Sequence, residues 1–505
     1  MRTLAVCAAL VGAALSGLRW LRVAQREHYL PGSATTFAWR WWWGTGANRL
    51  LGLAAVLGIV LATGSPLSAV AAAVAVGVGP FGLGLRGRTS PLAWTRRLRT
   101  LAAVWAAVHL LVVTAGILAG AGPAVALAAA VLTPVLVDLA LVLTAPVERR
   151  LAEPWVRRAA ERLARVAPEV VAVTGSYGKT TTKGYIAHLV AGSRSVVATP
   201  ASFNNRAGLA RTLNEHLTPG TEVLVAEMGT YGPGEIAELC RLCPPSVAVI
   251  CALGPVHLER MGSEEAILAA KAEILDGAQV AVLAVDHPLL ADLAARRAAT
   301  GQPVIRCSAL DREAQVAVVA GQVLLSGRVV ATLDPAAAAD VHPANLACAV
   351  AVALELGVTE AALAASLPGL PTPAHRLTAS RAPSGAVVLD DTYNANPAGG
   401  ASALAALARQ SRDDRQRVVV TPGMVELGNR QVDENRRFAA AAATVASHLL
   451  VVGHTNRAAL VEGAGDGAAE VVLVDTREQA VAWVRQHVGE GDVVLYENDL
   501  PDHFV

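Results

Sequence analysis

A short loop of glycine, lysine and hydroxyl residues is the stretch whose residue types and spacing are best suited to chemistry. It comprises Gly175, Ser176, Tyr177, Gly178, Lys179, Thr180 and Thr181. In such a loop, backbone N–H groups and the N-terminus of the next helix face an anion, the lysine reaches terminal phosphates and the next threonine can hold Mg²⁺. Val173 stands where the longer motif has glycine, so this is the short Gly-x-x-Gly-Lys-Thr form. The pattern predicts a phosphate-binding site, with an ordinary strand–helix turn as the alternative.

Lysine is rare in this chain, which sharpens the interpretation of the loop. Among the 42 lysines and arginines, the lysines are Lys179, Lys183 and Lys271. Arginine therefore serves wherever positive charge alone is needed. We expect the lysines where only a compact primary amine fits, and two of them lie in the loop or directly after it.

Three further side chains could reach the same site. Glu227 follows an apolar run that predicts a strand, and a carboxylate at the end of a strand beside a phosphate loop can bind Mg²⁺. His257 follows another predicted strand, and Lys271 lies in a predicted helix. Each has an ordinary alternative: Glu227 as a solvated carboxylate, His257 as a surface or core histidine, and Lys271 as an ion-pair partner of Glu265 or Glu273.

The elements that position these residues alternate between predicted strands and helices. A basic amphipathic helix from Glu153 to Arg165 leads to a strand at Val170–Val173, and Lys179 begins a helix that runs to about Val190. The continuing alternation indicates a parallel, doubly wound α/β domain, and a second series follows the proline-rich break at Leu367–Pro373. We predict a membrane region at 1–150, a central α/β domain at 151–372 and a C-terminal α/β domain at 373–505.

The first 150 residues hold most of the apolar excess of a chain that is 53% hydrophobic and 16% charged. Several apolar stretches approach the roughly 20 residues that cross a bilayer as a helix. We count five: Leu4 to Leu18, Leu50 to Thr63, Leu67 to Leu85, Leu101 to Leu118, and Ala124 to Thr144. The first two are short enough to be re-entrant or interfacial, and the first resembles a signal peptide without a clear cleavage site. We expect an α-helical, multi-pass region in contact with membrane lipid.

Arginine placement predicts how this region is oriented. Arginines follow the first, third and fifth stretches, whereas the turns near Gly64 and Gly120 carry no charge. By the positive-inside rule, everything after Arg149 is cytoplasmic, at the plasma membrane. The net charge of +1 gives no field that would attract nucleic acid. Asp138, inside the fifth stretch, either lines a functional cavity or makes a helix–helix polar contact. The arginines after the first stretch are Arg19, Arg22, Arg26, Arg40 and Arg49.

Five separated motifs occur in a recognisable order. They are Gly175-x-x-Gly-Lys-Thr-Thr, Glu227-Met-Gly, Gly254-Pro-Val-His-Leu-Glu, Lys271-Ala-Glu-Ile and Asp390-Asp-Thr-Tyr-Asn-Ala-Asn-Pro397. Together they resemble the Mur ligase family. The last motif is similar to its D-alanyl-D-alanine-adding branch, as are Thr199-Pro-Ala-Ser-Phe-Asn-Asn and Pro233-Gly-Glu-Ile-Ala-Glu-Leu. The similarity covers about residues 168–500 and implies a central P-loop ATPase domain followed by a Rossmann-like C-terminal domain.

The resemblance implies ATP-driven amide-bond formation: a carboxylate takes the γ-phosphate to give an acyl phosphate, and an amine then attacks the acyl carbon. It implies that Lys179 neutralises the β- and γ-phosphates, with Lys271 and His257 as further catalytic residues. Thr180 and Glu227 would hold one Mg²⁺, and His257 and a carbamylated Lys271 a second, so that two metals draw charge off the phosphate. The other implied contacts are Asn345 with adenine, Arg376 with the γ-phosphate, Asp391 with ATP on domain closure, and Asn394 and Asn396 with the amino substrate.

Three departures from the family leave the substrates open. Val341-His342 stands where the family has a His-Asn pair, the closing stretch Tyr496 to Phe504 differs from the expected Lys-Gly-Ser-Arg, and an apolar region replaces the UDP-binding domain. The carboxylate is therefore either UDP-muramoyl tripeptide, joined to D-alanyl-D-alanine, or a lipid-linked or other polymer precursor joined to an amino acid. A membrane transport ATPase is a competing class, but it gives no role to His257 and Lys271.

Overall fold

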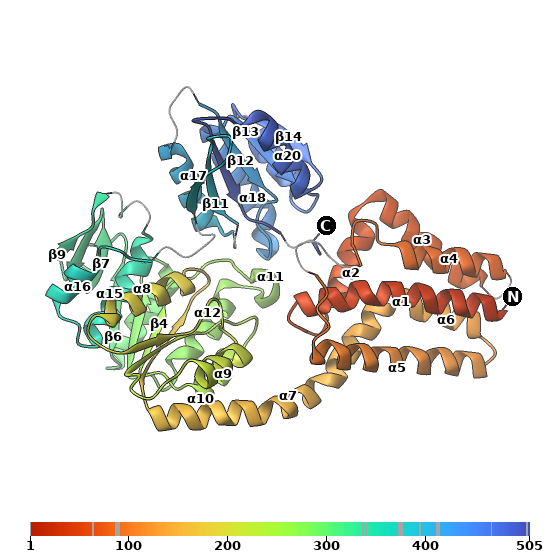
Figure 1. Ribbon diagram of the computed structural model, residues 1–505, viewed down its shortest axis with the longest axis horizontal. Coiled ribbons are helices and arrows are strands. Elements are labelled where there is room, and N and C mark those ends of the chain that lie inside the picture. The colour runs from red at the N-terminus through yellow and green to blue at the C-terminus, as the bar shows by residue number, and fades with distance from the viewer. Residues whose placement is uncertain are drawn as a thin grey trace. The chain divides into compact units, whose positions relative to one another are not determined.

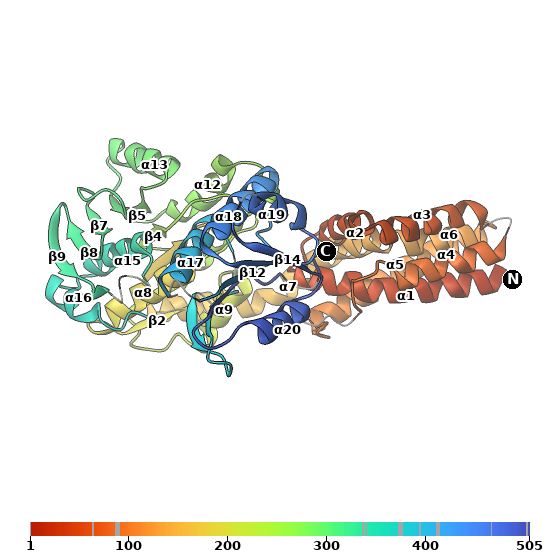
Figure 2. The ribbon, with the colours of Figure 1, turned by 90° about the horizontal axis from the view of Figure 1, so that it is seen from above.

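A computed structural model shows two compact units, each described here by itself (Figures 1 and 2). The N-terminal unit comprises Met1–Ala152 with Gly453–Thr455 and Asp499–Val505, and the α/β unit comprises Glu153–Val452 with Asn456–Asn498. The structure describes residues 2–504 except 63–64, 86–90, 336–337, 339–340, 372–376, 393–394, 411–414, 466 and 501–502. Two predicted site residues, Arg376 and Asn394, lie outside the described residues.

Small residues bring the helices of the N-terminal unit close together. α1 (Arg2–Arg26) lies along α4 (Pro66–Val78), which packs in turn against α3 (Gly46–Leu61) (Figures 1 and 2). A Cβ atom added to Gly12 of α1 or to Gly58 of α3 would collide with α4. Glycines at these contacts therefore permit close helix packing, as between helices in an apolar environment. The remaining helices are α2 (Ser33–Gly44), α5 (Arg96–Leu118), α6 (Gly122–Val131) and the first half of α7 (Thr133–Val166).

The apolar stretches form helices that differ from the five expected. By length and composition, α1 and α5 could span a membrane, and the number rises to four if each bent pair of described helices is one span. α2 and α3 meet at 112°, and α6 and α7 at 73°. The stretch from Ala124 to Thr144 is broken because Pro134 cannot continue the preceding helix. The amphipathic helix expected from Glu153 is instead the end of the continuous helix α7.

Two predicted polar residues of this region stabilise helix ends. Asp138 accepts hydrogen bonds from the backbone N–H groups of Ala34 (3.2 Å) and Thr35 (2.8 Å) at the start of α2, so it makes the helix–helix polar contact. Arg19 lies within α1, not in a loop, and donates to the carbonyl groups of Gly77 (2.8 Å) and Val78 (3.1 Å) at the end of α4. Arg19 therefore adds nothing to the loop charge that predicts orientation.

The segment Asp499–Val505 belongs to the N-terminal unit, where His503 and Phe504 contact α2. The indole Nε1 of Trp41 donates to the carbonyl of His503 (2.8 Å), and the imidazole Nε2 of His503 lies 2.9 Å from Glu27 Oε1. Phe504 meets Phe37 edge-on, with ring centroids 5.1 Å apart. Of the closing stretch, which departs from the family pattern, His503 and Phe504 are therefore seated among the N-terminal helices.

The first sheet of the α/β unit is mixed. Its order is β2-β3-β1-β4-β5-β6-β7-β8-β9, with parallel pairing from β2 to β7 and antiparallel pairing from β7 to β9. The expectation of a wholly parallel sheet was therefore wrong. Two-residue turns with positive φ, Ala320-Gly321 and Ser326-Gly327, make the antiparallel hairpins. The strands are β1 (Glu169–Thr174), β2 (Val196–Ala198), β3 (Val223–Glu227), β4 (Val247–Ile250), β5 (Val280–Ala284), β6 (Val304–Ser308), β7 (Val316–Val319), β8 (Gln322–Leu325) and β9 (Arg328–Thr332).

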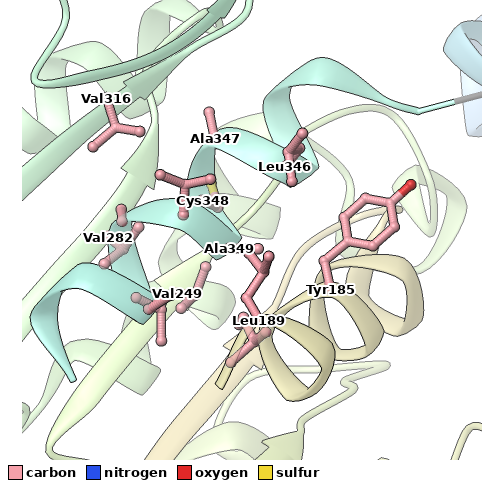
Figure 3. Close-up of a cluster of buried hydrophobic side chains, with 14 of the residues drawn as sticks. Tyr185, Leu189, Val249, Val282, Val316, Leu346, Ala347, Cys348 and Ala349 are labelled. Atoms are coloured by element: carbon pink, nitrogen blue, oxygen red, sulfur yellow. The ribbon is translucent and has the colours of Figure 1, made fainter. Parts of the chain in front are cut away.

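Helices on both faces of this sheet give it two cores. On one face, α8 (Lys179–Ala191) and α15 (Pro343–Glu355) pack Tyr185, Leu189 and Leu346 toward strand residues such as Val249 and Val282 (Figure 3). The run Ala347-Cys348-Ala349 lets α15 approach the strands closely (Figure 3). The other described helices of this part are α9 (Arg206–Glu215), α10 (Glu235–Leu242), α11 (Leu258–Met261), α12 (Glu264–Ala272), α13 (Pro288–Ala299) and α16 (Glu360–Ser366).

The second sheet has the order β10-β11-β15-β12-β13-β14 and is parallel except for the edge strand β10. Its alternating pattern follows the sequence prediction closely because apolar strand cores and amphipathic helices repeat regularly. The strands are β10 (Thr378–Arg381), β11 (Val387–Asp391), β12 (Arg417–Thr421), β13 (His448–Val452), β14 (Glu470–Val474) and β15 (Val493–Glu497). The helices are α17 (Pro397–Gln410), α18 (Gln431–Val445), α19 (Arg457–Ala464) and α20 (Arg477–His487), with a 3-10 turn, η2, at Gly428–Arg430.

Candidate active site

Three neighbouring strands bring the predicted site residues to one edge of the first sheet. β1 lies between β3 and β4, and all three run parallel. Val173 pairs with Glu227 at the end of β3, and Thr174 pairs with Ile250 at the end of β4. Because the carboxyl ends of parallel strands share an edge, the phosphate loop, Glu227 and the segment that leads to His257 all begin there.

Side chains of the phosphate loop brace it against the segment after β4. Ser176 Oγ donates to the carbonyl of Gly254 (3.0 Å) and accepts from the N–H of Gly254 (3.1 Å). The hydroxyl of Tyr177 donates to the carbonyl of Leu253 (3.2 Å). These side chains support the loop, and the backbone N–H of Ser176 also donates to the carbonyl of Ala252 (2.9 Å), so any contact with a phosphate would come from the N–H groups that follow Ser176 in the loop.

Gly178 turns the chain into α8 at a position where only glycine fits. Its φ is 79°, and a Cβ atom would collide with the side-chain amide of Asn345 on α15. Asn345 is 3% exposed, and its Oδ1 has no hydrogen-bond partner among the described residues. A buried polar atom without a partner is costly, so this amide is suited to a ligand bound at the loop.

Lys179 and Lys271 converge on one acceptor, the carbonyl oxygen of Gly175, at 2.9 Å and 3.0 Å. Burial, together with the smaller effect of the nearby charge of Lys179, lowers the pKa of Lys271 to about 7. In the described structure Lys271 has no acidic partner, and Glu273 accepts instead from backbone N–H groups of Gly234 and Ala237. The ion-pair alternative for Lys271 is therefore wrong. The amines of Lys179 and Lys271 both lie at the loop, where their positive charge could neutralise a polyphosphate.

Glu227 is buried and holds several donors at once, which contradicts the alternative of a solvated carboxylate. Its Oε2 accepts from Thr180 Oγ1 (3.0 Å) and from Lys183 Nζ (2.9 Å), and its Oε1 accepts from Asn204 Nδ2 (3.1 Å). The side chain of Glu227 is 1% exposed and that of Lys183 is 6% exposed. Glu227 is thus oriented toward the threonine that begins α8.

Lys183 is the site residue that sequence reasoning missed, although the scarcity of lysine pointed to it. It lies one helical turn after Lys179, and its ammonium group joins Glu227 to the carbonyl of Ala201 in the loop after β2. A compact ammonium group fits between two buried oxygens where a planar guanidinium would not. Lys183 is therefore a counter-ion and a support for Glu227.

His257 lies at the end of the segment that follows β4 and caps α11. It has a left-handed backbone, with φ of 67°, and its Nδ1 is 2.6 Å from Oε2 of Glu426, which follows β12. Burial lowers the pKa of His257, whereas the histidine and Arg260 outweigh burial and lower the pKa of Glu426 to about 2. The contact joins a neutral imidazole to an ionised carboxylate, so neither the surface nor the core alternative describes His257.

The predicted residues of the second sheet lie at the ends of its strands. Asp391 ends β11 and pairs in register with Glu497 at the end of β15. Asn396 is buried, and its Oδ1 accepts from the N–H of Gly399 at the start of α17 (3.0 Å). Among the described contacts, none joins Asp391 or Asn396 to the phosphate loop.

The donor set at the loop fits a nucleotide with a hard cation. The Thr180 hydroxyl and the Glu227 carboxylate are oxygen ligands of the kind that Mg²⁺ prefers, and the lysines and loop N–H groups suit phosphate. Within the described ranges, no three His, Cys, Asp or Glu side chains gather as a metal cluster. A second cation near His257 would therefore need a further oxygen ligand, which a carbamate on Lys271 would supply.

Comparisons with known proteins agree with this geometry. The model for the Mur ligase middle domain matches residues 173–338, and the model for the Mur ligase, glutamate ligase domain, matches residues 375–496. The UDP-N-acetylmuramoyl-tripeptide–D-alanyl-D-alanine ligase of Mycobacterium tuberculosis is 35% identical over 360 residues, which cover 65% of this chain and 69% of that protein. The enzyme of the same name from Bacillus subtilis is 31% identical over 275 residues, which cover 53% and 58%.

Solved structures show the same architecture. MurF from Acinetobacter baumannii has a TM-score of 0.58 and 25% identity, with 68% of this chain and 77% of that chain covered. MurF ligase from Thermotoga maritima in complex with ADP has a TM-score of 0.54 and 27% identity, with 69% and 80% covered. These matches set aside a transport ATPase. The chain belongs to the Mur ligase family and is an ATP-dependent acid–amino acid ligase with an additional N-terminal helical unit.

Proposed function

We propose that this protein is a membrane-anchored ligase that joins the carboxylate of a cell-wall precursor to the amine of an amino acid or dipeptide through an acyl phosphate. The observation that carries the proposal is the convergence of Lys179, Lys271, Thr180 and Glu227 at adjoining strand ends. A family model that covers residues 173–338 supports it. Such a site neutralises phosphate charge, which is what transfer of a phosphoryl group to a carboxylate requires.

The site residues take the following roles in this proposal. Lys179 and the loop N–H groups bind the β- and γ-phosphates of ATP, and the buried amide of Asn345 contacts the nucleotide. Thr180 and Glu227 hold one Mg²⁺, while His257 and a carbamylated Lys271 hold a second. Bound metal ions would withdraw charge from the phosphate and the reacting carboxylate. Arg376 and Asp391 would reach the nucleotide from the C-terminal domain, and Asn394 and Asn396 would face the amino substrate.

The names of the relatives point to the substrates. The relatives are UDP-N-acetylmuramoyl-tripeptide–D-alanyl-D-alanine ligases, so UDP-muramoyl tripeptide with D-alanyl-D-alanine is the first candidate pair. The second candidate is a lipid-linked or other polymer precursor with an amino acid. An apolar helical unit in place of the UDP-binding domain, with His503 and Phe504 of the closing stretch packed against it, favours this second carboxylate.

Mass spectrometry of the amide product separates these candidates. We expect the full-length protein to release ADP only when a carboxylate precursor and an amine are both present. The mass of the product should equal the mass of the precursor plus that of the amine, less one water. UDP-muramoyl tripeptide and a lipid-linked muramoyl peptide should be offered in parallel with D-alanyl-D-alanine and with single amino acids. ATP hydrolysis that proceeds equally well without any amine would contradict the proposed ligase chemistry.

Membrane anchoring rests on the surface of the N-terminal unit. Large apolar side chains are exposed along α3, α5 and α7, more than a soluble surface usually carries. Examples with exposed fractions above half are Leu53, Leu57, Leu110, Leu111 and Val142. Such a surface is stable when lipid tails cover it. The arginines outside α1 place the α/β unit in the cytoplasm by the positive-inside rule.

Reporter fusions test this topology. A reporter fused after Gly120, in the uncharged turn between α5 and α6, should be active on the extracytoplasmic side. The same reporter fused after Arg150, in α7, should be active in the cytoplasm. As a control, each fusion should be made with two reporters, one that is active only in the cytoplasm and one that is active only on the extracytoplasmic side. The reverse pattern would place the site away from cellular ATP, and recovery of the intact protein in the soluble fraction would exclude anchoring.

A further inference from the structure

A hydrogen bond between partly buried side chains joins His257, at the edge of the first sheet, to Glu426, which follows β12 of the second sheet. The two side chains are 18% and 24% exposed, and Nδ1 of His257 lies 2.6 Å from Oε2 of Glu426. The residues are 169 positions apart in the chain. Arg260 also approaches Glu426, with 3.4 Å between Nη2 and Oε1. Glu426 is thus held by partners from the other domain of the same α/β unit.

Both residues have an unusual backbone conformation. His257 has φ of 67° and Glu426 has φ of 64°, in the left-handed region that residues with a Cβ atom seldom adopt. Strain of this kind persists only where the surroundings impose it, and it gathers at functional sites. Here two strained residues from different domains direct their side chains at one another. The contact is therefore not a chance meeting of long, exposed side chains.

The backbone around Glu426 lies close to the backbone of the segment that contains Glu259. The N–H of Glu259 lies 3.4 Å from the carbonyl oxygen of Glu426. A Cβ atom on Gly428 would lie only 3.1 Å from the backbone nitrogen of Glu259. An ion pair between the domains also joins Arg430 Nη1 to Glu264 Oε1 at 2.7 Å. Arg430 belongs to η2 and contacts Glu264 and Glu434 rather than His257, so it offers a matched control.

A carboxylate that accepts a hydrogen bond from Nδ1–H of a histidine affects how that histidine binds a metal ion. When Nδ1–H donates to a carboxylate, the ring is fixed in orientation and tautomer, and Nε2 carries the lone pair that a metal ion needs. A histidine ligand is commonly supported in this way, and loss of the supporting group typically weakens metal binding by about 10- to 100-fold.

We propose that Glu426 is a positioning residue that orients His257 for the second cation, so that this cation site is complete only when the C-terminal domain is docked. The inference rests on the proposed role of His257 as a metal ligand. It links two events: docking of the C-terminal domain strengthens cation binding, and the cation in turn stabilises the docked arrangement by the same free energy. Glu426 then acts through His257 and touches neither nucleotide nor substrate.

Binding of Mn²⁺ to the full-length protein, with ADP and bicarbonate present, tests the proposal. Electron paramagnetic resonance should show that Glu426→Ala weakens one Mn²⁺ site by about 10- to 100-fold. Glu426→Gln, which keeps the shape and one acceptor oxygen, should weaken it less and guards against misfolding of the alanine variant. Arg430→Gln, which breaks the ion pair of Arg430 with Glu264, should change Mn²⁺ affinity by less than about twofold, since it leaves the support of His257 intact.

Nitrogen-15 spectra of histidine-labelled, metal-free protein give a second measurement that needs no activity. The signal of His257, identified by its loss in His257→Ala, should show the Nδ1–H tautomer in the natural protein and lose that preference in Glu426→Ala. Unchanged tautomer and unchanged Mn²⁺ affinity in Glu426→Ala, while His257→Ala loses the site, would overturn the inference and leave the proposed function standing. If His257→Ala itself keeps both Mn²⁺ sites, the proposed metal role of His257 fails, and the inference fails with it.

Discussion

Replacing Lys271 by arginine is expected to cost nearly as much activity as replacing it by alanine, although arginine keeps the positive charge. Lys271 is 2% exposed and contacts a backbone carbonyl, with no described acidic partner. Burial lowers its pKa to about 7, so a neutral amine that can attack CO₂ and release a proton is present at physiological pH. Arginine stays protonated and cannot form this carbamate. We expect kcat to fall by at least about 100-fold in both variants, as for the loss of a group that stabilises charge in the transition state.

Small carboxylates provide the control for this prediction. Acetate or propionate added to Lys271→Ala should restore part of the activity, because either can enter the vacated space and offer the oxygen ligand. The same anions should not help Lys271→Arg, whose side chain still fills the site. Full activity of Lys271→Arg would show that only the charge matters, and the proposed second cation site would be lost. Omission of CO₂ and bicarbonate from the natural protein should also lower its activity.

Lys179→Ala is expected to reduce kcat by about 100- to 1,000-fold or more, which is the usual cost of one group that stabilises developing charge. The lysine begins α8 beside Gly178, whose backbone is left-handed, and its Nζ donates to the carbonyl of Gly175. An amine at this position of a phosphate loop is suited to neutralise the terminal phosphates of a nucleotide. The measurement is the steady-state rate of ADP release in the presence of both substrates.

The two lysine variants should respond to opposite additives. A small ammonium ion such as ethylammonium should restore some activity to Lys179→Ala, where a cation is missing, and carboxylates should not. Thr180→Ala should instead raise the Mg²⁺ concentration needed for half activity, because it removes an oxygen beside Glu227. A Lys179→Ala enzyme with near-normal product formation would remove the phosphate-loop assignment altogether.

Local patterns in the sequence were enough to predict the phosphate loop and most of the α/β elements. The helix expected from Lys179 to about Val190 is α8 at Lys179–Ala191, and the strand expected at Val170–Val173 lies within β1 at Glu169–Thr174. Both depend on neighbouring residues: glycine permits the turn, and apolar residues at strand or helix spacing select the element. The antiparallel strands β7 to β9 were missed because Ala-Gly and Ser-Gly turns are weaker hairpin signals than Asn-Gly.

For single residues that belong to no local pattern, the sequence left more than one environment open, and only the fold decided between them. The sequence could not separate a solvated Glu227 from a buried one, or an ion-paired Lys271 from one that contacts a carbonyl. Burial of Glu227 depends on β3 lying beside β1, and the environment of Lys271 depends on where α12 places it relative to the phosphate loop. Both are results of strand order, which alternation alone does not specify.

The sequence by itself determined which chemistry the chain can perform, since a phosphate loop, scarce lysines and five ordered motifs are carried by residue type and spacing. Only the tertiary structure decided which partners those residues meet. Lys183 with Glu227, Glu426 with His257, and His503 with Glu27 are separated by 44, 169 and 476 positions. Contacts over such distances depend on how whole elements pack, and no local periodicity records that packing.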